Sequence, residues 1–210
     1  MDGGGEGAGG WLQGGGGQGR GDGVAVLAGG AEGGDTLLGA PSGGGEAVAG
    51  DLPSLVGLAG RPPKSEPVRG IHTLCVSPLK ALAVDVARNL EAPIAEMGLD
   101  IRVETRTGDT PQGKRQRQRF DPPQMLMTTP EQIALLIASR EAPKLFANLK
   151  TIVLDELHAL VPSKRGDLLA LGTARLRTFA PDLRVVGLSA TVADPESLAR
   201  WPMDQSGGTS

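Results

Sequence analysis

Short apolar strands alternate with helical patterns along residues 71–201, and this alternation limits the possible folds more than any other feature. The strands are predicted at 71–77, 101–106, 124–128, 151–155 and 183–188, with one more at 36–39. The helices are predicted at 79–97, 130–139, 166–178 and 194–201. Strands separated by helices of this length form βαβ units, so we expect a three-layer α/β fold with a mainly parallel sheet. Such sheets bind ligands at the carboxyl ends of their strands.

Glycine is concentrated at the N-terminus, where residues 1–50 hold 22 of the 33 glycines. A Gly-rich chain loses much backbone entropy on folding and buries little surface, so we expect residues 1–35 to be disordered. We place the folded domain at 36–201 and a polar, disordered tail at 202–210. The single cysteine, Cys75, excludes a disulfide framework. No apolar run approaches the ~18 residues of a membrane span, so we expect a cytoplasmic protein without membrane contact.

The acidic segment Asp155-Glu156-Leu157-His158 directly follows the apolar strand TIVL. Hydrolysis of a nucleoside triphosphate requires Mg²⁺ near the phosphates and a group that orients water. Asp155 is suited to the metal and Glu156 to the water. A strand exit with two solvated acids is the alternative interpretation. Ser189 and Thr191 follow the next strand, where their hydroxyls can bond to His158 or the carboxylates, although a helix N-cap has the same residues.

Three further loops combine small or hydroxyl residues with the start of a helix. They contain Ser77, Pro78 and Lys80, then Thr107 and Gly108, and finally Thr129, Pro130 and Glu131. Free N–H groups at helix N-termini bind anions and suit backbone phosphates, but any α/β protein begins its helices in this way. The basic run 114–119 could contact nucleic acid, although we favour a solvated helix face there.

Five ordered motifs resemble the first RecA-like domain of superfamily 2 helicases. The segments SPLKAL, TGD, TTPE, DELH and SAT are similar to motifs Ia, Ic, Ib, II and III, and SPLKALAVDVARNL and DELHAL resemble the Lhr (large helicase-related) branch. The resemblance covers about 36–201 and implies a RecA-like P-loop fold that uses ATP and Mg²⁺ to act on single-stranded DNA or RNA. It implies that Asp155 binds Mg²⁺ and that Glu156 is the catalytic base. It also implies that His158, Ser189 and Thr191 couple hydrolysis to strand grip, and that the three loops line the nucleic-acid track.

The phosphate-binding loop departs from the family pattern, which is about APTGxGKT. The aligned residues are Ala40, Pro41, Ser42, Gly43, Gly44, Gly45, Glu46 and Ala47. Glu46 stands where a Lys reaches the phosphates, and Ala47 stands where a hydroxyl binds Mg²⁺. At ~4 Å and an effective dielectric near 20, each such charge pair amounts to about 4 kcal/mol. We therefore expect the glycines to cradle phosphate only weakly, and ATP binding to be poor.

Three interpretations of the function remain open. The first is the ATP-binding domain of a helicase, whose second RecA-like domain is missing from this chain. The second is a catalytically inactive module that binds single strands. The third is an inert product of a damaged or misread gene, since 39 of residues 1–51 are Gly, Ala, Val, Asp or Glu, the amino acids whose codons begin with G. Sequencing both strands of the gene distinguishes a misread sequence from the other interpretations.

Overall fold

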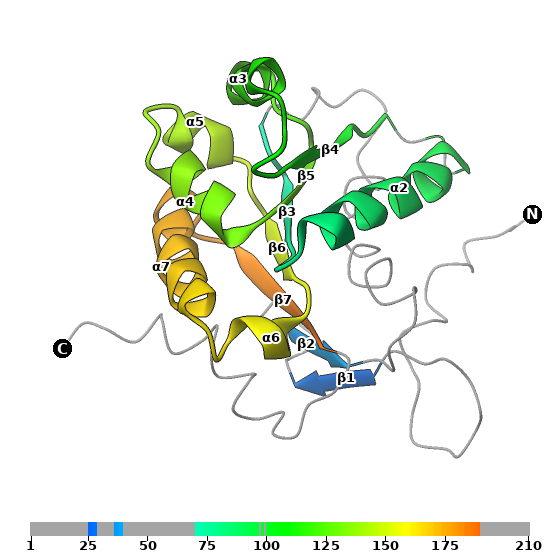
Figure 1. Ribbon diagram of the computed structural model, residues 1–210, viewed down its shortest axis with the longest axis vertical. Coiled ribbons are helices and arrows are strands. Elements are labelled where there is room, and N and C mark those ends of the chain that lie inside the picture. Colours follow the sequence, from blue (N-terminus) through cyan, green and yellow to red (C-terminus); the bar gives the residue numbers. More distant parts are fainter. Residues whose placement is uncertain (1–24, 29–35, 40–69, 97, 99, 190–210) are drawn as a thin grey trace, which may run out of the picture.

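A seven-stranded sheet forms the centre of the protein in the computed structural model (Figure 1). The structure describes residues 25–28, 36–39 and 70–189 except 97 and 99. The strand order is β1-β2-β7-β6-β3-β5-β4. All strands from β2 to β4 in this order are parallel, and only β1 is antiparallel to its neighbour β2. The strands are β1 Ala25–Ala28, β2 Thr36–Gly39, β3 Thr73–Val76, β4 Val103–Arg106, β5 Met125–Thr128, β6 Thr151–Leu154 and β7 Arg184–Ser189.

Helices cover both faces of the sheet, so the three-layer prediction is confirmed. Helix α2, Lys80–Glu96, lies on one face, and the other face carries α4 Pro130–Ile137, α5 Ala142–Phe146 and α7 Lys164–Phe179 (Figure 1). The side-chain alternation of the strands divides the core between these layers. On β3, Leu74 and Val76 belong to the cluster under α4, α5 and α7, whereas Cys75 belongs to the cluster under α2. Burial on both faces explains why the strands read as continuous apolar runs.

The predicted elements are all present within the described residues, each within a few residues of its expected bounds. The helix favoured for the basic run 114–119 is present as α3 Gln112–Phe120, and the structure adds two short helices, α5 and α6 Leu157–Leu160. It also adds β1, which lies inside the segment 1–35 that we expected to be disordered. The rest of that segment, the expected helix at 194–201 and the tail 202–210 lie outside the described residues.

Helix α7 starts in direct contact with α6. The Ser163 hydroxyl donates to the Leu160 carbonyl at 2.7 Å and accepts from the Gly166 amide at 3.3 Å, which makes Ser163 an N-cap. A Cβ at Gly166 would lie 2.5 Å from the Leu160 carbonyl oxygen and 2.9 Å from that of Val161. The absence of a side chain at Gly166 therefore allows the first turn of α7 to pack on the end of α6.

Candidate nucleotide-binding and strand-binding edge

The predicted motifs of the described region lie at one edge of the sheet, because parallel strands end together. Val76 pairs with Thr128 and with Leu154, and Leu154 pairs with Gly187. The residues that follow these strand ends therefore lie side by side. They are Ser77 after β3, Thr129 after β5, and Asp155 after β6, beside Ser189 at the end of β7.

Asp155 lies partly buried at the centre of this edge. Burial, and secondarily the neighbouring Glu156 charge, raise the pKa of its carboxyl above the usual value. Opposing this, the carboxylate accepts from the Glu156 amide at 2.9 Å and from the Ser77 hydroxyl. An anion that is held in place yet disfavoured by its surroundings suits a bound cation. No group of three His, Cys, Asp or Glu gathers among the described residues, so a metal here would need phosphate or water ligands, as Mg²⁺ commonly has.

Glu156 has a left-handed backbone, with φ 51° and ψ 45°. It is the only non-glycine residue with positive φ in the described part of the chain. Its carboxylate Oε2 lies 3.1 Å from His158 Nε2, and His158 Nδ1 lies 3.1 Å from the Ser189 hydroxyl oxygen. This conformation costs about 1–3 kcal/mol and is found most often at functional sites, where surrounding contacts hold it. The predicted grouping of the acidic motif with Ser189 is thus present in the structure.

Lys80 is already paired with a carboxylate. Its Nζ lies 2.9 Å and 3.0 Å from the two carboxylate oxygens of Asp109, in the loop of Thr107 and Gly108. The Thr107 amide donates to the Thr110 hydroxyl at 2.9 Å, and the Thr107 hydroxyl accepts from the Asp109 amide at 3.3 Å. The structure therefore brings the Lys80 and Thr107 loops together. The role of Asp109 as the partner of Lys80 was not anticipated.

Glu131 is bound by an arginine that sequence reasoning missed. Arg165 Nε donates to Glu131 Oε1 at 2.5 Å, and Arg165 Nη2 donates to Oε2 at 3.0 Å. Hydrogen bonds from Arg165, the largest cause, and from Thr129 lower the pKa of the Glu131 carboxyl. Pro130 is buried at the first position of α4, as predicted. The sequence position of Arg165 was one available indication of a special role, because a cation in the first turn of a helix is unfavourable beside the positive end of the helix dipole.

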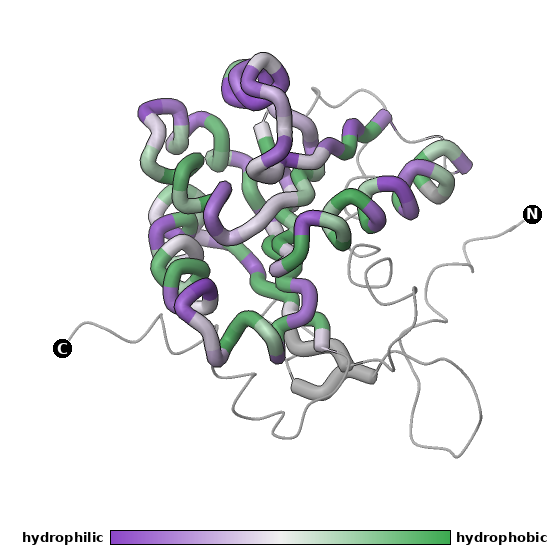
Figure 2. Tube along the Cα trace, in the orientation of Figure 1, coloured by the Kyte–Doolittle hydropathy of each residue, from purple (hydrophilic) through white to green (hydrophobic). Residues whose placement is uncertain are grey.

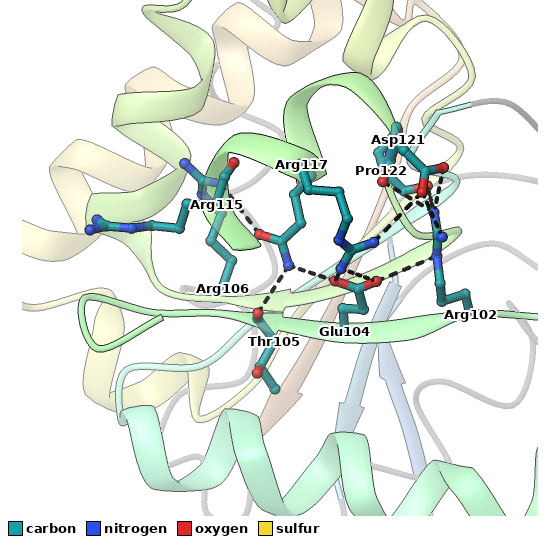
Figure 3. Close-up of polar contacts among 9 residues, drawn as sticks. Arg102, Glu104, Thr105, Arg106, Arg115, Arg117, Asp121 and Pro122 are labelled. Carbon is teal, nitrogen blue, oxygen red and sulfur yellow. Dashed lines mark hydrogen bonds and ion pairs between the residues drawn. The ribbon is translucent and has the colours of Figure 1, made fainter. Parts of the chain in front are cut away.

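The basic run docks α3 on β4. Almost all of α3 is hydrophilic (Figure 2). Arg117 Nη2 lies 2.6 Å and 2.8 Å from the two oxygens of Glu104, and Gln118 Nε2 donates to Glu104 at 2.9 Å (Figure 3). Arg102 binds Asp121 through two 2.8 Å contacts, beside the same Glu104. Part of the run therefore serves a structural role, which the solvated-face interpretation did not include.

Arg106, the last residue of β4, is a buried cation directly before the Thr107 loop. Its side chain donates to the Arg115 carbonyl at 2.8 Å and to Gln118 Oε1 at 3.3 Å. Burial first, and then the charges of Arg119 and Arg115, lower its pKa to about 10. Both of these acceptors are neutral, so dipoles hold this charge.

The phosphate-loop residues fall outside the described part of the chain. They are Gly43, Gly44, Gly45, Glu46 and Ala47, and Thr191 of the last motif is also outside. Their roles remain predictions.

Comparison with known proteins agrees with this arrangement. Residues 24–198 match the family model described as DEAD/DEAH box helicase. The chain is 41% identical over 181 residues to an Lhr helicase/probable uracil glycosylase of Mycolicibacterium smegmatis. It is 38% identical over 182 residues to an ATP-dependent helicase Lhr-Core protein 2 of Thermococcus barophilus. The chain belongs to the DEAD/DEAH box helicase family. Within that family, it is similar to the Lhr-type helicases over about 180 residues.

Solved structures give the same result. The Mycobacterium smegmatis helicase Lhr bound to ssDNA and AMP-PNP matches with a TM-score of 0.73 and 39% identity, over 81% of this chain. The DEAD-box protein Mss116, at 21% identity and a TM-score of 0.68, shares the fold. The chain spans 12% and 20% of the two curated relatives' lengths and 22% of the Lhr structure. No described helix is long and apolar enough to cross a membrane.

Proposed function

We propose that this domain binds Mg-ATP and a single nucleic-acid strand as one part of a nucleic-acid-dependent motor. The observation that supports this most directly is the contact chain from Asp155 through Glu156 and His158 to Ser189, at the carboxyl edge of the sheet. The relative bound to ssDNA and AMP-PNP supports both ligands for this fold. A cytoplasmic location remains a prediction.

In this proposal the chain's own residues have separate tasks. Asp155 offers a carboxylate held by the Ser77 hydroxyl and the Glu156 amide, and it would bind Mg²⁺. Bound Mg²⁺ would neutralise charge on the transferred phosphoryl group. The Glu156 carboxylate contacts His158 and would orient the attacking water. His158 also contacts Ser189 at the end of β7, so these contacts link the acidic segment 155–158 to the neighbouring strand.

We further propose that Glu46 and Ala47 weaken ATP binding in the chain as written. The test is calorimetric titration of Mg-ATP into the chain and into a Glu46→Lys/Ala47→Thr variant. Charge reversal beside the phosphates should make the variant bind at least about tenfold more tightly. Adding Asp155→Ala to that variant is the control, and it should remove the dependence of binding on Mg²⁺. Equal affinities of the chain and the variant, or low-micromolar binding by the chain as written, would contradict the proposed defect.

A catalytically inactive strand-binding module is the second candidate. The sequence at Glu46 and Ala47 favours it, together with the three loops that the structure gathers at one edge. This candidate predicts that the anisotropy of a labelled oligo-dT or oligo-rU rises with the chain, falls with salt and does not respond to ATP. A response to ATP would favour the motor domain instead. No rise in anisotropy at any salt concentration would reject strand binding by this chain.

A further inference from the structure

Arg165 joins three segments that lie far apart in the sequence. Its Nε and Nη2 bind the two carboxylate oxygens of Glu131 at the start of α4. Its Nη1 donates to the Pro78 carbonyl at 2.6 Å, in the loop between β3 and α2. Arg165 itself is in the first turn of α7, which follows the acidic segment 155–158 and α6. One guanidinium therefore holds two of the loops proposed to bind a strand against the helix that follows Glu156 and His158.

The placement of Arg165 is not explained by helix stability. The first turn of a helix carries a partial positive charge, so a cation there is unfavourable. The backbone at this point is nevertheless fixed. The Ser163 cap and the close approach of Gly166 to the Leu160 carbonyl hold the start of α7 in place against α6. The Arg165 side chain therefore extends from a fixed backbone, and its guanidinium group is bound on both sides.

We propose that Arg165 is a positioning residue of the strand-binding surface. It fixes the spacing between the Pro78 loop and the Glu131 loop, and it neutralises Glu131, whose free carboxylate would repel a phosphate backbone. The inference rests on the proposed function in one respect, that these two loops bind the strand. With Glu131 and Pro78 as its acceptors, Arg165 acts through them and is not itself a phosphate ligand.

The first experiment uses amide protection to test, without any ligand, how firmly the two loops are held. Hydrogen exchange of the full chain is compared among the wild type, Arg165→Ala and Lys164→Ala. Lys164 is the matched control, because it is an exposed cation in the same helical turn. Faster exchange of the amides at 79–83 and 131–134 is expected in Arg165→Ala alone. Unchanged exchange at both loops, with an unchanged melting temperature, would overturn the fixed spacing.

The second experiment measures binding of a labelled oligo-dT by anisotropy. Arg165→Ala should weaken binding about fivefold, the effect of one partly exposed ion pair, and Glu131→Gln alone should weaken it less, because it loses the ion pair but leaves no free carboxylate. The double variant Arg165→Ala/Glu131→Gln should recover part of the loss, because no free carboxylate remains. A purely structural defect would not be rescued in this way.

The outcomes separate the two proposals. If the wild type binds no oligonucleotide, the proposed strand binding fails, and hydrogen exchange still tests the positioning of the loops. If the wild type binds and Arg165→Ala binds equally well, the positioning role is overturned. If binding is lost and Glu131→Gln rescues none of it, the neutralising role is wrong: Arg165 then acts through loop spacing alone if hydrogen exchange has also changed, and through direct contact with the strand if it has not.

Discussion

The imidazole Nδ1 of His158 lies 3.1 Å from the Ser189 hydroxyl oxygen, so the acidic turn after β6 is joined to the end of β7. On the other side of the ring, Nε2 lies 3.1 Å from Glu156 Oε2. An ionised carboxylate only accepts hydrogen bonds, so Nε2 must carry the proton. The hydroxyl, which both donates and accepts, then donates to Nδ1 when the ring is neutral.

This geometry predicts the tautomer of His158. In the nitrogen-15 spectrum of the two histidines, the neutral form of His158 should be protonated at Nε2 and unprotonated at Nδ1. Ser189→Ala should shift the Nδ1 resonance towards that of a nitrogen without a hydrogen bond and leave His72 unchanged. A proton on Nδ1 in the wild type would contradict the arrangement.

Asp155 should destabilise the protein at neutral pH. Because its folded pKa is raised, the folded state takes up the proton more readily than the unfolded state, and stability is lost as pH rises through the folded pKa. Asp155→Asn should therefore increase the free energy of unfolding at pH 7 by up to about 1 kcal/mol. The gain should vanish below the ordinary aspartate value of 3.8, which urea unfolding at several pH values can measure. A variant that is less stable at pH 7 would contradict this prediction.

Glu104 should stabilise the attachment of α3. Burial alone would raise its pKa, but hydrogen bonds from Arg117 and Gln118 outweigh burial and lower it. Its contribution is therefore present above the ordinary value of 4.5 and is lost as pH falls through the folded pKa. Glu104→Gln should cost about 1–2 kcal/mol at pH 7, and less as the pH falls below 4.5. Glu91→Gln, on the exposed side of α2, is the control and should melt like the wild type at pH 7.

Gly166 should not tolerate a methyl group. The new Cβ would lie 2.5 Å from the Leu160 carbonyl oxygen, and backbone there cannot move aside cheaply. Gly166→Ala should lower the free energy of unfolding by about 2 kcal/mol or more. Gly113→Ala in α3 is the matched control, because nothing lies within 4 Å of its Cβ, and it should be neutral or stabilising. Equal effects of the two substitutions in chemical denaturation would contradict the close contact.

Features that depend on local pattern were predictable from the sequence. Continuous apolar runs predicted β3, β5, β6 and β7, and parallel strands must bring Asp155 and Ser189 to one edge. Contacts made by long side chains across the fold were not predictable. Nothing local indicates that Lys80 pairs with Asp109, or that Arg165 reaches a carbonyl 87 residues away. Likewise, the run 114–119 reads as solvated until β4 supplies Glu104 as its partner.

The pairing of β2 with β7 has a consequence for how the chain folds. Thr36 lies opposite Val186, about 150 residues further along the chain. Contacts of such separation form slowly, because a long loop must close before they contribute. During synthesis β2 would emerge early and then wait, with its edge unpaired, until β7 has been made. The antiparallel β1, which precedes β2 by only a few residues, can pair with β2 during this interval and shield one of its two edges from other chains.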